Sequence, residues 1–148
     1  MHALSQEDRD FRAAFEACQV STADFTHRGH LRLAYCYLAE GGAELAVSQF
    51  RQALGRFLRH NAIDSGKYSE TLTQAWVLAV DHFMHSCGDT DSAEAFLSKS
   101  SRLLDAKIML KHYSKDVLFS AAARARFVEP NLLPIPRHES LRNAPPAT

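Results

Sequence analysis

Residues 25–38 read FTHRGHLRLAYCYL, and this stretch has the spacing of an amphipathic helix. At about 3.6 residues per turn, one face carries His27, His30, Leu31, Ala34, Tyr37 and Leu38. The opposite face carries Arg28, Arg32 and Glu40. Two imidazoles therefore point inward, side by side, at the start of a helix. A hydrophobic core has little use for two adjacent histidines unless something binds them, so the pair is the first candidate for a functional site.

His27 and His30 stand three residues apart, so both rings can reach one point on the helix face. Neutral imidazole is the commonest metal ligand and the natural general base near neutral pH. The alternative interpretation is structural, with each ring hydrogen-bonded to backbone carbonyls or to a neighbouring tyrosine. We predict that both rings face the same internal cavity, close enough to share one ligand or one ion.

The rest of the chain predicts an all-α fold, a single-domain bundle of about five helices with an extended C-terminal strap. Spacing and capping residues predict helices over residues 5–18, 27–40, 43–60, 69–86 and 92–112, the last broken near residues 98–101. Pro130, Pro134 and Pro136 require the extended strap. We expect one domain over residues 1–136 and a flexible tail over residues 137–148. The predicted common core consists of Phe50, Phe57, Leu72, Trp76 and Phe83.

The composition argues against several classes of partner. Lys and Arg total 17, as do Asp and Glu, so the formal net charge is zero and no basic stripe for nucleic acid or polybasic membrane patch is expected. The longest apolar run, residues 75–80, is too short to span a bilayer. The three cysteines lack a CxxC pattern and indicate reduced thiols in a cytoplasmic protein. Cys36 falls off the apolar face of its helix and has no local base.

A second polar cluster lies where a loop enters the helix predicted over residues 69–86. Glu70 can complete His27 and His30 as an open metal triad, or act as a general base beside them. Alternatively, Glu70 belongs to a polar stripe with Gln74, Asp81 and His85 that faces water, and its charge favours the start of the helix. We predict that Tyr68 and Glu70 lie at the mouth of the histidine cavity, Tyr68 as a hydrogen-bonding group.

The other histidines are weaker candidates. His82 and His85 repeat the three-residue spacing, but near the end of a helix, where histidine is favoured electrostatically. His138 falls in the expected tail.

Three segments carry a resemblance to a known family. Residues 25–34 (FTHRGHLRLA), 66–73 (GKYSETLT) and 127–136 (FVEPNLLPIP) resemble an uncharacterised family of short, all-helical bacterial proteins. Its members read F-x-H-x-x-H-L, then K-Y-H-E-T, then F-x-x-P-x-L-x-P-x-P. The resemblance implies that His27, His30, Tyr68, Glu70 and Thr71 belong to one site. The chain departs from the pattern at Ser69, where the family often has histidine, so a metal site here would lack that ligand or draw on another residue.

Two function classes follow. The first is a small-molecule enzyme with His27, His30, Glu70 and Tyr68 as catalytic residues, possible with or without one divalent metal held by His27, His30 and Glu70. Fe(II) would leave positions for oxygen and substrate, and Zn(II) would leave a water to activate. The second is a non-catalytic helical module that binds a small ligand or a protein, with histidines that are merely hydrogen-bonded.

Overall fold

The computed structural model describes residues 1–138, and these contain α-helices and 3₁₀ turns but no β-strand, which confirms the all-α class. The α-helices are α1 (Gln6–Glu16), α2 (His27–Glu40), α3 (Ala43–His60), α4 (Glu70–Ser86), α5 (Ala93–Lys99), α6 (Lys115–Leu118) and α7 (Ala121–Ala125). The 3₁₀ turns are η1 (Ser65–Lys67), η2 (Ser101–Leu104) and η3 (Ala106–Lys111). The predicted bounds of α2 and α3 are confirmed, whereas the helix expected over residues 92–112 is α5 followed by η2 and η3.

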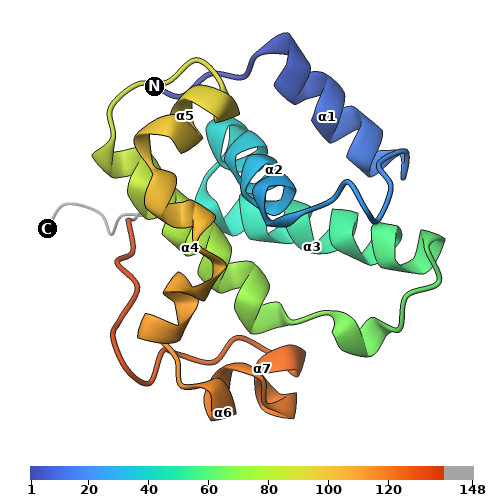
Figure 1. Ribbon diagram of the computed structural model, residues 1–148, viewed down its shortest axis with the longest axis vertical. Helices are drawn as coiled ribbons and strands as arrows, with labels where there is room; N and C mark the ends of the chain where they lie inside the picture. The colour runs from blue at the N-terminus through green and yellow to red at the C-terminus, as the bar shows by residue number, and fades with distance from the viewer. Residues whose placement is uncertain (139–148) are drawn as a thin grey trace, which may run out of the picture.

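Helix α2 lies at the centre of the bundle and contacts α1, α3, α4 and α5 (Figure 1). Its side chains are therefore buried on almost every side, and Leu33, Tyr35 and Cys36 have no exposed surface. The expectation that Cys36 falls outside the apolar face was wrong, because α1 and α5 cover the second face of α2. Burial raises the pKa of the Cys36 thiol to about 12, which leaves it unreactive at neutral pH.

The buried carboxylate of Asp8 helps to join α1 and α5 to α2. Asp8 forms a capping box with Ser5 at the start of α1. It also accepts hydrogen bonds from the Ala93 amide at 3.0 Å and from Nε of Arg32 at 3.1 Å. Because all three helices meet on one ionised group, its loss would disturb the packing of each of them.

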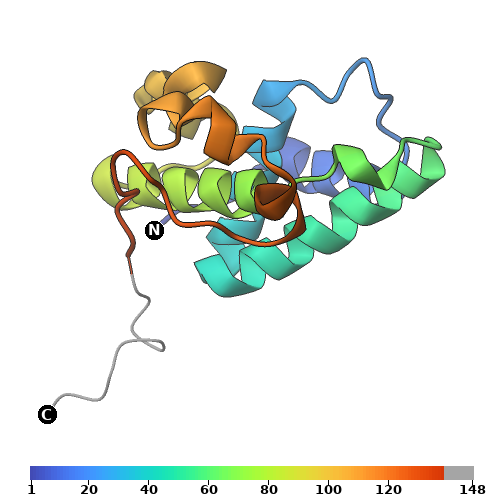
Figure 2. The same cartoon turned by 90° about the horizontal axis from the view of Figure 1, so that it is seen from below.

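Helix α4 is also covered on more than one face. It packs on α2 and α3 on one side and on α7 on another, and the strap runs along it (Figure 2). The alternative interpretation, in which Glu70 and Asp81 belong to a stripe of α4 that faces water, is therefore wrong. Glu70 and Asp81 are buried, whereas Leu72, Trp76 and Phe83 are only half-buried. Trp76 and Phe83 pack at the margin of the core that holds Phe50 and Phe57, and Leu72 packs against a second, smaller core.

The C-terminal strap, residues 127–138, contains no helix, as the prolines predict, and it bends at residues 131–133. The hydroxyl of Thr71 fixes its start by donating to the Arg126 carbonyl at 2.8 Å and accepting from the Val128 amide at 3.0 Å. The strap buries Ile135 in this second, smaller core, which includes Tyr113. His138, which we expected in the tail, hydrogen-bonds to His82 on α4. The rest of the expected tail, residues 139–148, lies outside the described residues.

Candidate functional site

A cleft of about 360 Å³ opens between the first turns of α2, the second half of α3 and the first turns of α4. His27, His30, Tyr68, Ser69 and Thr73 provide its polar lining, with Lys67. The apolar lining consists of Phe50, Leu54, Leu58, Leu72 and Trp76. A volume of this size lies within the range of pockets that bind small organic molecules.

His30 is held in one orientation by its own helix. Nδ1 of its ring lies 2.9 Å from the Thr26 carbonyl, which also accepts the His30 backbone amide at 3.0 Å. The ring stacks on Phe25 with centroids 4.0 Å apart. A Cβ at Gly29 would lie 3.1 Å from the Phe25 ring, so the glycine leaves room for this stack. A carbonyl can only accept, so Nδ1 carries the proton and Nε2 keeps a free lone pair.

The electrostatics favour a neutral His30. Burial lowers the pKa of His30 below its ordinary 6.5, the Thr26 carbonyl opposes that shift, and a charge on His27 would add to it. The imidazole is therefore uncharged at neutral pH, with Nε2 unprotonated. Within residues 1–138, no group hydrogen-bonds to this nitrogen.

His27 is held by a different part of the chain. Its Nε2 lies 2.9 Å from the Leu103 carbonyl in η2, and its ring meets Trp76 edge-on with centroids 4.7 Å apart. Because Nε2 carries the proton and donates it in a hydrogen bond to this carbonyl, Nδ1 is an acceptor in the neutral ring. Each cleft histidine thus commits one nitrogen to a backbone carbonyl and keeps the other without a partner among the described residues.

The side chains of residues 67–71 point in different directions. Lys67, Tyr68 and Ser69 line the cleft. Glu70 points to α3, where Arg51 holds its carboxylate with two hydrogen bonds of 2.8 and 2.7 Å. Thr71 binds the strap. Of the residues that the family resemblance groups together, Glu70 and Thr71 therefore face away from the cleft.

Glu70 is fully engaged by its neighbours. Besides the two bonds from Arg51, its carboxylate accepts hydrogen bonds from the Tyr68 hydroxyl at 2.8 Å and from Nε2 of Gln74 at 2.5 Å. Burial alone would raise the pKa of Glu70, but the bonds from Arg51, Gln74 and Tyr68 together lower it below the ordinary value. Glu70 is therefore an ionised structural group that fixes Tyr68.

The predicted metal triad is not assembled. Glu70 does not line the cleft with His27 and His30. Among residues 1–138, no three His, Cys, Asp or Glu side chains are placed to hold a metal ion. The structure brings together His27, His30 and Tyr68, and it adds Trp76, which we had placed in the core. Ser69, Thr73 and Trp76 stand at i, i+4 and i+7, a spacing that could have indicated a shared face.

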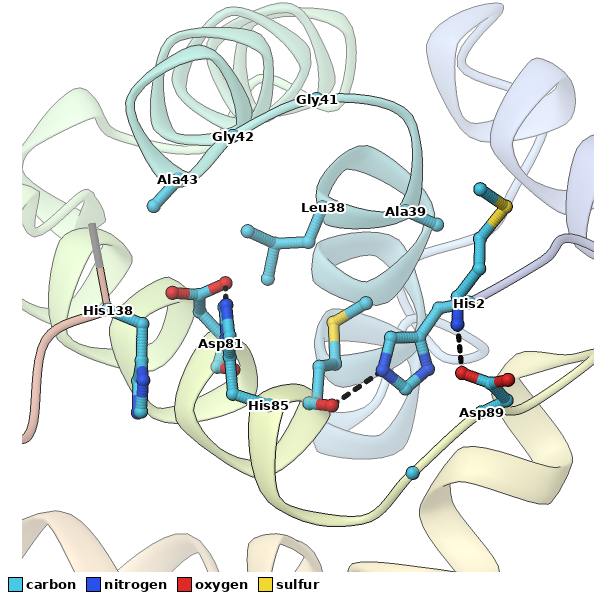
Figure 3. A pocket seen from close by; sticks show the side chains of 13 residues that line it. His2, Leu38, Ala39, Gly41, Gly42, Ala43, Asp81, His85, Asp89 and His138 are labelled. Carbon is cyan, nitrogen blue, oxygen red and sulfur yellow. Dashed lines mark hydrogen bonds and ion pairs between the residues drawn. The ribbon is translucent and has the colours of Figure 1, made fainter. Parts of the chain in front are cut away.

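A larger cleft of about 660 Å³ lies at the other end of α4 (Figure 3). Asp81, His85 and His138 lie on one side of it and His2 on the other. The His85 and His138 rings stack in parallel at 4.3 Å, and Nδ1 of His85 lies 3.5 Å from the Asp81 carboxylate. Both ring nitrogens of His2 are committed, to Thr90 and to the Met84 carbonyl. We regard the smaller cleft as the candidate site, because it combines two histidines with the aromatic side chains of Phe50, Tyr68 and Trp76, whereas the described lining of the larger cleft contains no Phe, Tyr or Trp.

Comparison with known proteins found no matching family model, no matching curated protein and no matching solved structure. Within residues 1–138, the helices are too short or too polar for any of them to cross a membrane.

Proposed function

We propose that the cleft between α2, α3 and α4 binds a small organic molecule and that His30 acts on it as a general base. One observation carries this proposal: His30 is neutral, is held by the Thr26 carbonyl, keeps Nε2 without a partner among residues 1–138, and lines a cleft with aromatic side chains. A general base needs an available lone pair in a fixed position at the working pH.

The neighbouring groups suit supporting roles. His27, with its proton directed to the Leu103 carbonyl, offers a second acceptor for orienting the molecule. The pKa of Tyr68 is raised to about 12, first by burial and further by its hydrogen bond to Glu70, although Thr73 opposes the shift. The phenol therefore stays protonated and fixed. Trp76 and Phe50 supply flat apolar surface for the body of the molecule.

The reaction proposed here is proton transfer from the bound molecule, or from a water beside it, to Nε2 of His30. This proton transfer needs no metal ion and no third ligand, so it replaces the metal triad predicted with Glu70. The proposal also keeps part of the grouping implied by the family resemblance, since His27, His30 and Tyr68 share the cleft.

The test uses Trp76, which is the single tryptophan of the chain and lies in the cleft. Small molecules that change its fluorescence are selected, and each is then assayed for chemical turnover with wild type, His30→Phe and a His60→Gln control on the exposed end of α3. The proposal expects turnover that His30→Phe abolishes and the control keeps. Binding without turnover would support the non-catalytic alternative, and a screen in which no small molecule changes the Trp76 fluorescence would contradict a site in this cleft.

A further inference from the structure

Most polar side chains of the cleft already use their protons in hydrogen bonds within the protein. The Nδ1 proton of His30 goes to the Thr26 carbonyl, and the Nε2 proton of His27 goes to the Leu103 carbonyl. Backbone carbonyls cannot donate, so these directions are fixed by chemistry as well as by distance. In their neutral rings, both histidines therefore have a lone pair, and no proton, left for an incoming molecule.

The hydroxyl groups follow the same pattern. Tyr68 donates to the ionised carboxylate of Glu70 at 2.8 Å. Thr73 donates to the Ser69 carbonyl at 2.9 Å and lies close enough to Tyr68 to affect its pKa. The Ser69 hydroxyl points to the Ala123 carbonyl at 3.4 Å, while its oxygen accepts the Leu72 amide at 3.1 Å. None of these three hydroxyls keeps a proton for a ligand unless an internal bond is broken.

We propose that the cleft selects molecules whose buried end is a hydrogen-bond donor: an amine, an amidine, an N–H heterocycle or a hydroxyl group on a flat apolar body. A carboxylate, phosphate or ether at that end would meet the lone pairs of His30, His27 and Tyr68 and would lose its own hydration without compensation. This inference rests on the proposed function, because it describes what the same cleft binds.

Two donors remain in the lining. One is the indole Nε1–H of Trp76, for which residues 1–138 provide no hydrogen-bond partner; it belongs to the ring that His27 meets edge-on. Lys67 is the other, and its position limits its effect. Its ammonium group is a donor, but the residue is exposed and belongs to η1, beside the cleft mouth. It can meet an acceptor at the outer end of a bound molecule, with little influence on the inner end. The selectivity for donors therefore applies to the end that reaches His30.

Two pairs of probes test this inference. Indole and benzofuran have nearly the same shape and apolar area, but only indole has an N–H group. Benzamidine and benzoate likewise contrast a donor with an acceptor. Binding is titrated by NMR, following the ring signals of His27 and His30, with wild type, His30→Phe and the His60→Gln control. The phenyl ring of the His30→Phe variant keeps the stack on Phe25 and removes the free nitrogen.

Indole should bind roughly tenfold more tightly than benzofuran, and benzamidine more tightly than benzoate, with both preferences reduced in His30→Phe and kept in the control. Equal or reversed preferences, with the histidine signals still shifting, would overturn the donor inference and leave the proposed function standing. Failure of all four probes to shift these signals would contradict the proposed function, and the donor inference would fall with it.

Discussion

Arg51 and Glu70 form a two-bond ion pair that ties α3 to the first residue of α4, with distances of 2.8 and 2.7 Å. The pair also fixes Tyr68, whose hydroxyl donates to the same carboxylate. Glu70 thus acts on the cleft through Tyr68, as a positioning residue.

Glu70→Gln should destabilise the fold by about 1–2 kcal/mol, because the carboxylate is nearly buried while Arg51 is close to half-exposed and partly screened. Urea denaturation measures the change. Glu94→Gln, which removes an exposed partner of Arg28, is the matched control and should cost less than about 0.5 kcal/mol. Equal effects of the two substitutions would show that the Arg51 pair contributes no more than an ordinary surface pair.

Stability should fall in acid because of Asp8 and Glu70. Burial alone would raise the pKa of each carboxyl group, but hydrogen bonds outweigh burial and lower both pKa values in the folded state. Asp8 accepts these bonds from Ala93, Ser5 and Arg32. Glu70 accepts them from Arg51, Gln74 and Tyr68. In acid the unfolded chain therefore binds more protons than the folded one. The two ionised carboxylates stabilise the fold fully above their ordinary pKa values of 3.8 and 4.5, and this stabilisation is lost as the pH falls through their lowered pKa values in the folded state. Urea midpoints measured from pH 7 to pH 3 check this, and the Asp8→Asn variant should show a smaller decline. A variant that declines as steeply as wild type would contradict the role of Asp8.

Trp76→Ala should cost clearly less stability than Phe96→Ala, because Trp76 is half-buried in the cleft wall and Phe96 is fully buried. Truncating a fully buried aromatic side chain costs about 3–5 kcal/mol. Denaturation midpoints of the two variants measure the difference. A Trp76→Ala loss as large as that of Phe96→Ala would place Trp76 in the core after all.

Thr71→Val should loosen the start of the strap, since it removes both hydrogen bonds to Arg126 and Val128. We expect a loss of about 1–3 kcal/mol from two unsatisfied backbone groups, and faster hydrogen exchange at the Val128 amide. Thr22→Val, at an exposed turn, is the control and should leave that amide unchanged. Unchanged exchange in Thr71→Val would show that other contacts hold the strap.

Local signals predicted much of the fold. The bounds of α2 and α3 follow from helical spacing and from Gly41-Gly42, both of which can be read along the chain. The faces of α4 could not be predicted in the same way, because a helical wheel assumes one wet side and α4 is covered by α2, α3, α7 and the strap. Glu70 and Asp81 are buried for this reason.

In the candidate site, too, features within one helix could be predicted from the sequence, whereas contacts between helices could not. The shared orientation of His27 and His30 depends on spacing within α2, and the sequence predicts it. The partner of Glu70 is Arg51, which lies 19 residues earlier on another helix. The partner of His27 is the carbonyl of Leu103, 76 residues later. Such pairs depend on how helices pack, which the pattern within any one helix does not contain.

The tautomer of His30 tests the central claim most directly. Long-range ¹H–¹⁵N NMR spectra distinguish a proton on Nδ1 from one on Nε2, and a titration gives the pKa of each histidine. At neutral pH, His30 should be a neutral ring with the proton on Nδ1 and a pKa below 6.5. An Nε2-protonated ring, or a His30 that titrates at or above 6.5, would contradict the assignment of its Nε2 as the base of the cleft.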